Sequence, residues 1–598
     1  MTMEPMTELQ LSPNALKVLE HRYLRKDASG RVVETPEQLF RRVAAAIALA
    51  EERFAPEERS RWEGRFYEAM AGRWFLPNSP TLMNAGTAIG QLSACFVLPV
   101  PDSIPGIFGA LTEMALIHQT GGGTGFSFSR LRPAGDIVAE TGGVASGPVS
   151  FMRVFDVATD VIKQGGRRRG ANMGVLAVEH PDIEAFVTVK DDRTAMTNFN
   201  LSVGIRDAFM EAVDSGGSWP LVNPRTGETV RHVEARELWE LICAAAWRNG
   251  DPGLLFLDEV NRHNPTPSVG AIEATNPCGE QPLLPYESCN LGSINLARLA
   301  EGGVFDWEHL DELVRLAVRF LDDVIEVNRF PVPAIAEMTK ANRKIGLGVM
   351  GFAEALIELG IPYDSDEAVR FAEELMARIE AVGHAASAEL ARQRGPFPNF
   401  ERSTWKERGS PPLRNATVTT VAPTGTISII ADTSSGIEPL FALAYHRTVL
   451  DGQELPEVNK LFVRALEREG LPVEEILERV RCTGSVRSLA EVPERLRRLF
   501  PVALDLPPEV HIRIQAAFQR HTDNAVSKTI NLPADATVDE VRRAFRLAYE
   551  LRCKGITVFR YGCRGEQVLE LGKVPSFVAT GRAVAHAEFA GECRICST

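Results

Sequence analysis

From about residue 80 to residue 560, short runs of β-branched and other apolar residues alternate with longer stretches whose apolar side chains recur at helical spacing. Clear short runs are residues 95–98, 174–178, 201–205, 417–421 and 555–559. Residues 310–328 and 366–393 are amphipathic and long enough to form helices. Continuous apolar runs separated by helices are typical of parallel strands covered by helices. The alternation therefore predicts an α/β fold with buried, mostly parallel strands.

Two changes in this pattern predict the domain boundaries. Residues 13–75 carry apolar positions at helical spacing, and a Pro-Asn-Ser-Pro sequence at 77–80 interrupts them. After Tyr561 the sequence becomes rich in Gly, Arg and Glu and loses its periodicity, which is typical of a mobile tail. The expected parts are a helical N-terminal domain over residues 1–80, an α/β domain over 81–560 and a flexible C-terminal tail over 561–598.

Composition excludes several classes of protein. With 65 Lys and Arg against 79 Asp and Glu the net charge is −14, and no basic block is present to bind a nucleic-acid backbone. No apolar run approaches the roughly 20 residues of a membrane-spanning helix, and residues 1–11 do not resemble a secretion signal. Cysteines are few and odd in number, so a secreted disulfide framework is not expected. We expect a cytoplasmic protein that binds neither nucleic acid nor membrane.

Residues 346–351 spell Gly-x-Gly-x-x-Gly and lead into a helix predicted over residues 352–359. In dinucleotide-binding folds this motif follows a buried strand, and an acidic residue comes about twenty positions later. Here residues 334–344 are predicted to be helical, and no acidic residue follows a second strand at that spacing. Close packing of a helix against a strand is therefore the favoured interpretation.

Residues 417–428 are a better candidate for phosphate binding. A β-branched run leads into Pro423, Thr424, Gly425 and Thr426, whose hydroxyl and backbone N–H groups can surround a phosphate. An ordinary turn has the same composition, and the segment alone favours the turn.

Cys593 and Cys596 form a Cys-x-x-Cys pair almost at the chain end. The pair could be half of a zinc site, a dithiol or two incidental cysteines. Because no second pair with metal-ligand spacing lies nearby, a structural zinc site is disfavoured and no metal site is predicted. A dithiol on a flexible tail can exchange with a disulfide elsewhere in the protein.

Residues 276–293 contain an irregular polar loop within the predicted α/β core, because three prolines and a glycine prevent regular structure over a dozen residues. Such a loop needs a functional reason. One reason is to hold Cys278 beside a base, Glu280, and a hydrogen-bonding amide, Asn276, with Cys289 eleven residues after the first cysteine. Two incidental buried thiols remain the alternative.

This segment resembles the finger loop of ribonucleotide reductases, and other segments match that family in the same order. They are residues 77–86 followed by Cys95 (substrate-phosphate turn and first redox cysteine), 164–171 and 193–200 (effector loops), 423–428 (phosphate loop) and 521–533. The resemblance covers most of the chain. It implies a ten-stranded α/β barrel of two parallel half-barrels with a central finger loop, preceded by a small helical domain.

The subclass is inferred partly from what the sequence lacks. The seven tyrosines are never adjacent, whereas classes that receive a radical from a small subunit carry two neighbouring tyrosines near the chain end. The sequence around Tyr561 does not match the glycyl-radical motif of the anaerobic class. The remaining class uses adenosylcobalamin, and residues 554–558 resemble it. A class I large subunit that needs a separate radical-generating subunit, and a catalytically inactive nucleotide-binding regulator, stay open as alternatives.

The resemblance also implies catalytic roles. The cofactor radical would take hydrogen from Cys278, whose thiyl radical would abstract the ribose 3′ hydrogen. Glu280 would act as general base on the 3′ hydroxyl, and Asn276 would hydrogen-bond the sugar. The residues implied to hold the substrate are Ser79, Ala94, Cys95, Gly123, Asn276, Cys278, Glu280, Pro423, Thr424, Gly425, Thr426 and Ile427.

Reducing equivalents are implied to come from two cysteine pairs. Cys95 and Cys289 would close to a disulfide as the 2′ hydroxyl leaves as water, and Cys593 and Cys596 would reduce that disulfide by thiol exchange. A thioredoxin-type protein is the expected external reductant.

Regulation is expected to follow the family as well. Asp102 and Arg132 occupy the positions that contact a deoxynucleotide or ATP effector, and a homodimer is expected. The helical region starts near Leu11, so we expect no further N-terminal regulatory domain, and effectors should change base preference without stopping the enzyme.

Overall fold

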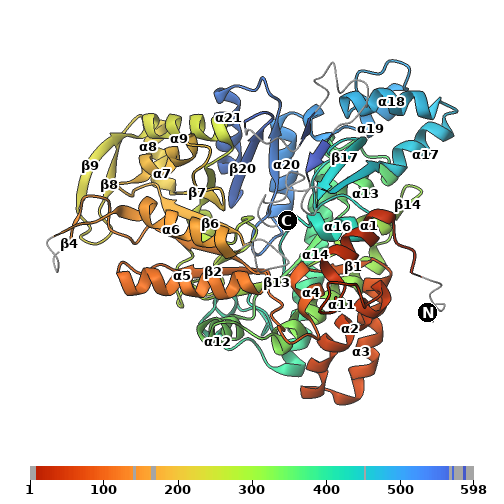
Figure 1. Ribbon diagram of the computed structural model, residues 1–598, viewed down its shortest axis with the longest axis horizontal. Helices are drawn as coiled ribbons and strands as arrows, with labels where there is room; N and C mark the ends of the chain where they lie inside the picture. The colour runs from red at the N-terminus through yellow and green to blue at the C-terminus, as the bar shows by residue number, and fades with distance from the viewer. Residues whose placement is uncertain are drawn as a thin grey trace.

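The computed structural model describes residues 9–138, 143–162, 170–449, 453–563, 569–570 and 584–586. In these residues a group of N-terminal helices packs beside a large α/β domain (Figure 1). Most of the predicted first effector loop, and the tail cysteines Cys593 and Cys596, lie outside the described residues. Within the described part of the chain, no helix combines the length and the apolar character needed to cross a membrane.

The N-terminal region is helical, as its apolar spacing predicted. α1 (Pro13–Val18) continues directly into a π-helical turn, η1 (Leu19–Tyr23). α2 (Pro36–Ala48) and α3 (Arg59–Ala71) pack against each other and against α11 (Trp307–Val327) of the barrel domain. The apolar side chains of these helices join one continuous core with those of the barrel helices, so the N-terminal region is fixed to the barrel.

The first half of the barrel is a parallel sheet. Its strands, in spatial order, are β2 (Cys95–Pro99), β3 (Gly123–Ser127), β6 (Asn172–Ala177), β7 (Phe199–Ile205) and β10 (Gly253–Phe256). Almost all of their residues are buried, which explains why these runs are apolar without alternation. The three runs predicted in this part of the chain coincide with β2, β6 and β7, except that Val178 lies one residue beyond the end of β6.

The second half closes the ring. Its strands are β20 (Gly555–Arg560), β19 (Thr529–Leu532), the segment 417–421, β16 (Ile345–Met350) and β13 (Ser288–Asn295). β20 runs parallel to β19 and β16 parallel to β13, while parallel bridges join Leu347 to Thr419 and Val421 to Val526. The antiparallel pairs β13–β2 and β10–β20 join the two halves. The implied barrel of two parallel half-barrels is therefore confirmed.

The Gly-x-Gly-x-x-Gly motif is strand β16 itself, followed by the predicted helix α13 (Phe352–Leu359). A Cβ atom on Gly346 would lie 2.5 Å from Cδ2 of Leu291, and one on Gly348 would lie 2.3 Å from the backbone oxygen of Thr420. The glycines thus let neighbouring strands approach closely. Close packing does explain the motif, but it is packing between strands, and the expected packing of a helix against a strand is wrong.

A hairpin of β11 (Ala274–Thr275) and β12 (Pro282–Leu283) enters the barrel, and we call residues 274–283 the finger hairpin. β11 packs against β2, β3 and β6. The approach is so close that a Cβ atom on Gly125 would lie 1.8 Å from the backbone oxygen of Thr275. Gly125 in β3 therefore leaves space for the finger hairpin. A central finger loop is what the resemblance to ribonucleotide reductases implied.

Candidate active site

The tip of the finger hairpin is held by both halves of the barrel. From the first half, Asn200 Nδ2 donates to the carbonyl oxygen of Pro277 over 2.8 Å. From the second half, the backbone N–H of Ala525 and the hydroxyl of Thr420 each donate to the carbonyl oxygen of Glu280 over 2.9 Å. Cys278 lies between these anchors, so its position is fixed relative to both half-barrels.

Cys95 and Cys289 lie opposite each other in the antiparallel pair of β2 and β13. They are not disulfide-bonded, and their exposed fractions are 2% and 0%. Burial raises the pKa of the Cys289 thiol well above its ordinary value, with the nearby Lys344 cation acting in the opposite direction. Cys289 is therefore kept as a thiol, which can give up a hydrogen atom or a proton.

Asn276 and Glu280 lie beside this pair, and both are almost completely buried. Asn276 Nδ2 donates to Cys95 Sγ over 3.1 Å, and its Oδ1 accepts from the backbone N–H of Gln281 over 2.9 Å. Cys95 Sγ donates to Glu280 Oε1 over 3.8 Å. A carboxylate, an amide and a thiol thus meet at one point, where a proton can pass between the carboxylate and Cys95.

A cavity of about 670 Å³ opens at this point. All twelve residues predicted to hold the substrate line it, from Ser79 at one wall to Ile427 at the other. Further lining residues that the sequence did not single out are Asn78, Pro277, Leu291, Gly292, Ser293 and Ala422. Three of these six residues, Leu291, Gly292 and Ser293, belong to strand β13. They could be found only with knowledge of how the strands pair.

The predicted phosphate segment forms one end of this cavity. Thr424 has a left-handed backbone (φ 60°) and precedes α16 (Gly425–Ala431), and Ser79, the first residue of α4 (Ser79–Asn84), lines the same cavity. The first backbone N–H groups of a helix have no partner within the helix. The segment therefore offers N–H and hydroxyl donors to an anionic group, beyond what an ordinary turn requires.

The N-terminal helices reach the same end of the cavity through η1. The hydroxyl of Tyr23 lies 2.7 Å from Oγ of Ser79, and Nη1 of Arg22 donates to Oγ1 of Thr426 over 3.4 Å. Both residues are buried. Sequence reasoning missed both residues, because nothing in the local pattern distinguishes them from other polar residues of an amphipathic helix.

A second cavity of about 970 Å³ lies on the other side of the hairpin tip. It is bordered by β7, β10, β19 and β20, and by residues 515 and 526–528. Pro277 and Cys278 line both cavities. Cys278 is therefore the residue that can exchange an atom with a molecule in either one.

Comparison with known proteins identifies the family. The family described as "Ribonucleotide reductase, barrel domain" matches residues 93–412 and 406–559, and "Ribonucleotide reductase, all-alpha domain" matches residues 9–90. This chain belongs to the ribonucleotide reductases. The helical region and the barrel correspond to these two family domains.

Relatives of this reductase carry informative names. The chain is 53% identical over 587 residues to the vitamin B12-dependent ribonucleoside-diphosphate reductase of Mycobacterium tuberculosis, covering 98% of this chain and 82% of the relative. It is 50% identical to the protein of the same name from Thermoplasma acidophilum, covering 94% and 81%. The Actinobacillus ureae class Id ribonucleotide reductase alpha subunit has a similar fold, with a TM-score of 0.75 and 24% identity over 92% of this chain and 97% of that one.

The two residues predicted to contact an effector are also brought together in the reductase. Arg132 Nε donates to Asp102 Oδ2 over 2.8 Å, and the backbone N–H of Arg132 donates to Oδ1 over 3.2 Å. Asp102 follows β2, and Arg132 follows β3. They form a partly exposed acid–base pair at the ends of adjacent parallel strands, where loops that bind ligands commonly lie.

Proposed function

We propose that this reductase converts ribonucleoside diphosphates to 2′-deoxyribonucleoside diphosphates, with adenosylcobalamin as its radical source. The observation that carries the proposal is that Cys278 lines both cavities. One cavity contains the residues implied for the substrate, and the other gives a radical source access to the same thiol. Relatives named as vitamin B12-dependent diphosphate reductases support the choice of cofactor and substrate.

The second cavity suits the adenosyl part of the cofactor. It combines backbone at Gly250, Gly253 and Gly555 with hydroxyl groups at Ser202 and Thr557, a lining that can accept the edges and hydroxyls of a nucleoside. When bound, adenosylcobalamin supplies a carbon-centred radical that removes a hydrogen atom from a thiol. The absence of adjacent tyrosines from the sequence supports this source over a radical-generating small subunit.

The residues of the chain then carry out the reduction. The Cys278 thiyl takes the 3′ hydrogen of the ribose, and Glu280 accepts the 3′-hydroxyl proton while Asn276 holds the sugar. The 2′ hydroxyl leaves as water with a proton from the Cys95/Cys289 pair. Those thiols give up two electrons and two protons and form one disulfide, and Cys278 returns the hydrogen to C3′. Ribonucleotide and dithiol thus become deoxyribonucleotide, disulfide and water.

The remaining roles belong to the same proposal. Cys593 and Cys596 pass electrons from a thioredoxin-type protein to the disulfide, and Asp102 and Arg132 contact a deoxynucleotide or ATP effector in a cytoplasmic homodimer. Residues 1–80, 81–560 and 561–598 act as helical domain, catalytic barrel and redox tail. A dithiol segment is needed because the Cys95/Cys289 pair is too buried for a protein reductant to reach.

One assay tests the proposal. Purified chain with dithiothreitol and a nucleoside diphosphate should form deoxynucleotide when adenosylcobalamin is added, and none without it. Product that appears only after a second, radical-generating protein is added would support the class I alternative. Nucleotide binding without product under either condition would support the inactive regulator.

A further inference from the structure

We propose that Arg22, from the π-helical turn of the N-terminal region, binds the terminal phosphate of the substrate. The N-terminal helices would then form part of the substrate site, in addition to supporting the barrel. The proposal rests on the proposed function, because it takes the ligand of the 670 Å³ cavity to be a nucleotide.

The need for a cation follows from the lining of the cavity. None of the described residues that line it is Lys or Arg, and its one charged lining residue is Glu280, an acid. A nucleoside diphosphate is a multiply charged anion, and hydroxyl and backbone N–H groups bring only partial positive charges. A full positive charge directly behind the wall would add to these partial charges.

Arg22 is placed to provide that charge. Its guanidinium donates to the hydroxyl of Thr426, which lines the cavity at its phosphate end, over 3.4 Å. A phosphate oxygen that accepts a hydrogen bond from the same hydroxyl would lie within about 6 Å of Nη1. Arg22 is only 7% exposed, so little water screens it from such an anion. Guanidinium groups also match phosphate oxygens with two parallel N–H bonds.

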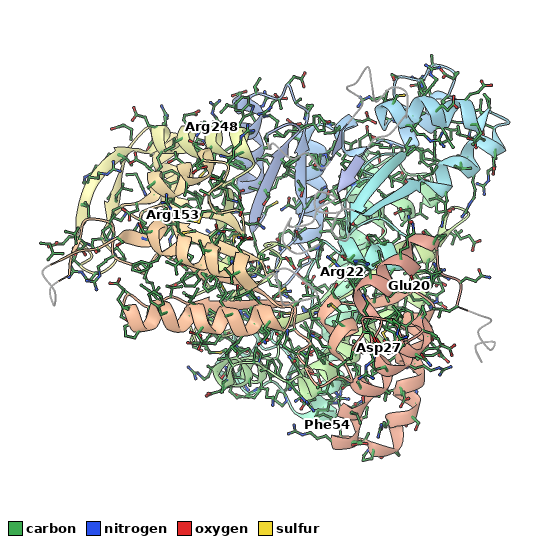
Figure 2. All side chains as sticks on the ribbon, viewed as in Figure 1. Glu20, Arg22, Asp27, Phe54, Arg153 and Arg248 are labelled. Atoms are coloured by element: carbon green, nitrogen blue, oxygen red, sulfur yellow. The ribbon has the colours of Figure 1, made fainter. Side chains whose placement is uncertain are left out.

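The surroundings of Arg22 provide a second, independent observation. The next residue, Tyr23, contacts Ser79, another residue that lines the cavity, over 2.7 Å, so two consecutive residues of one turn contact two lining residues from different elements. η1 packs against α4, and α1 packs against α16, the two helices that begin at this cavity. Single π-helical turns occur frequently at functional sites. Arg22 lies where the N-terminal helices meet the barrel domain (Figure 2).

The test separates binding from structure by comparing three variants with the parent. Arg22→Gln should raise the KM for a nucleoside diphosphate at least tenfold and leave kcat within about twofold, because binding that is equal in ground and transition states changes KM alone. Arg22→Lys should recover part of the affinity. Arg25→Gln is the matched control, since Arg25 is exposed three residues later in the same region and should behave as the parent.

Inorganic pyrophosphate is the probe for the phosphate end itself. Its binding constant, measured by calorimetry on the intact chain, should weaken at least tenfold in Arg22→Gln and less in Arg22→Lys. The proposal would be overturned if a folded Arg22→Gln protein kept the KM and the pyrophosphate affinity of the parent. It would also be overturned if Arg22→Gln lowered kcat and the melting temperature but bound pyrophosphate as tightly as the parent, because Arg22 would then have a structural role only. If the parent binds pyrophosphate through Arg22 but reduces no nucleotide, the proposed function fails while the phosphate site stands.

Discussion

Cys95 and Cys289 are direct cross-strand partners at the antiparallel junction of β2 and β13, where the two half-barrels meet. Opposed residues in antiparallel strands have Cα atoms about 4.5–5.5 Å apart, which is within the span of a disulfide. The pair can therefore oxidise without a change in strand register.

This relationship predicts the product of a single turnover. Pre-reduced enzyme that turns over once without external reductant should contain one new disulfide, between Cys95 and Cys289, per deoxynucleotide formed. Peptide mass mapping after thiol blocking measures both quantities. A new disulfide that involves one of the other described buried cysteines, Cys243, Cys553 or Cys563, would contradict the assignment.

The Cys278→Ser variant should lose turnover completely and keep its nucleotide affinity. An oxygen-centred radical is much harder to form than a thiyl radical, yet the two side chains are nearly the same size. Product formation and calorimetric substrate binding measure the two properties. Cys482→Ser, which removes an exposed thiol on α18 (Val473–Thr483), should retain full activity. Turnover in Cys278→Ser would remove Cys278 from the mechanism.

The Cys593→Ser, Cys596→Ser double variant should lose multiple turnover with a thioredoxin-type protein and keep most of its activity with dithiothreitol. The Cys95/Cys289 pair is buried in the barrel, where a small dithiol can diffuse but a protein cannot dock. Single turnover after pre-reduction should be normal. The measurement is the ratio of the two rates in variant and parent, and an unchanged ratio would exclude the shuttle role.

A buried ionic cluster predicts where the fold is most sensitive. Arg394, at the end of α14 (Asp366–Arg394), is fully buried and bonds Glu51 of the N-terminal region at 2.6 Å and Asp323 of α11 at 2.5 Å. Arg394→Met should lower the free energy of unfolding by about 3–5 kcal/mol, because it leaves the buried Asp323 without its cation and leaves Glu51 with Arg319 alone. Urea unfolding measures this.

The matched control for Arg394 lies on the same helix. Arg378 pairs with Asp311 at the surface, and its side chain is 47% exposed. Arg378→Met should therefore cost at most about 1 kcal/mol. If Arg394→Met and Arg378→Met lowered the free energy of unfolding equally, burial of the ionic cluster would not determine how much it contributes to stability.

The pair of His384 and Asp523 predicts a pH dependence. Burial lowers the pKa of His384, but the Asp523 carboxylate 2.9 Å away outweighs it, so the net pKa is raised above 6.5. The stabilisation is therefore complete below about pH 6.5 and is lost as the pH rises through the folded-state pKa. The stability difference between parent and His384→Gln, measured by urea unfolding, should be constant just below about pH 6.5 and should shrink as the pH is raised above it. A constant difference would exclude a charged pair.

Local sequence patterns predicted the helices and strands well. A strand that is buried on both faces is a continuous apolar run, and an amphipathic helix has apolar residues at helical spacing. α14 was predicted to within one residue at each end, and the apolar runs at 174–178 and 201–205 fall on β6 and β7 to within two residues at each end. The segment 417–421 was also predicted as an extended run, although it joins the barrel through isolated bridges.

Contacts between distant segments had no such signature. The register that opposes Cys95 and Cys289 depends on strand pairing, which no local pattern encodes. Arg22 resembles any charged residue on an amphipathic helix until α16 is packed beside it. Site residues were therefore predicted through family resemblance, and their geometry required the fold.

The carbonyl oxygen of Glu280 accepts hydrogen bonds from Thr420 and Ala525, two residues that the ribosome adds long after the finger hairpin. During most of its synthesis the chain thus carries Cys278 without the hydrogen bonds that tie the hairpin tip to the second half-barrel. A nascent or truncated chain has the reactive thiol but not its aligned surroundings. The surroundings of Cys278 are therefore completed only when nearly the whole barrel has been synthesised.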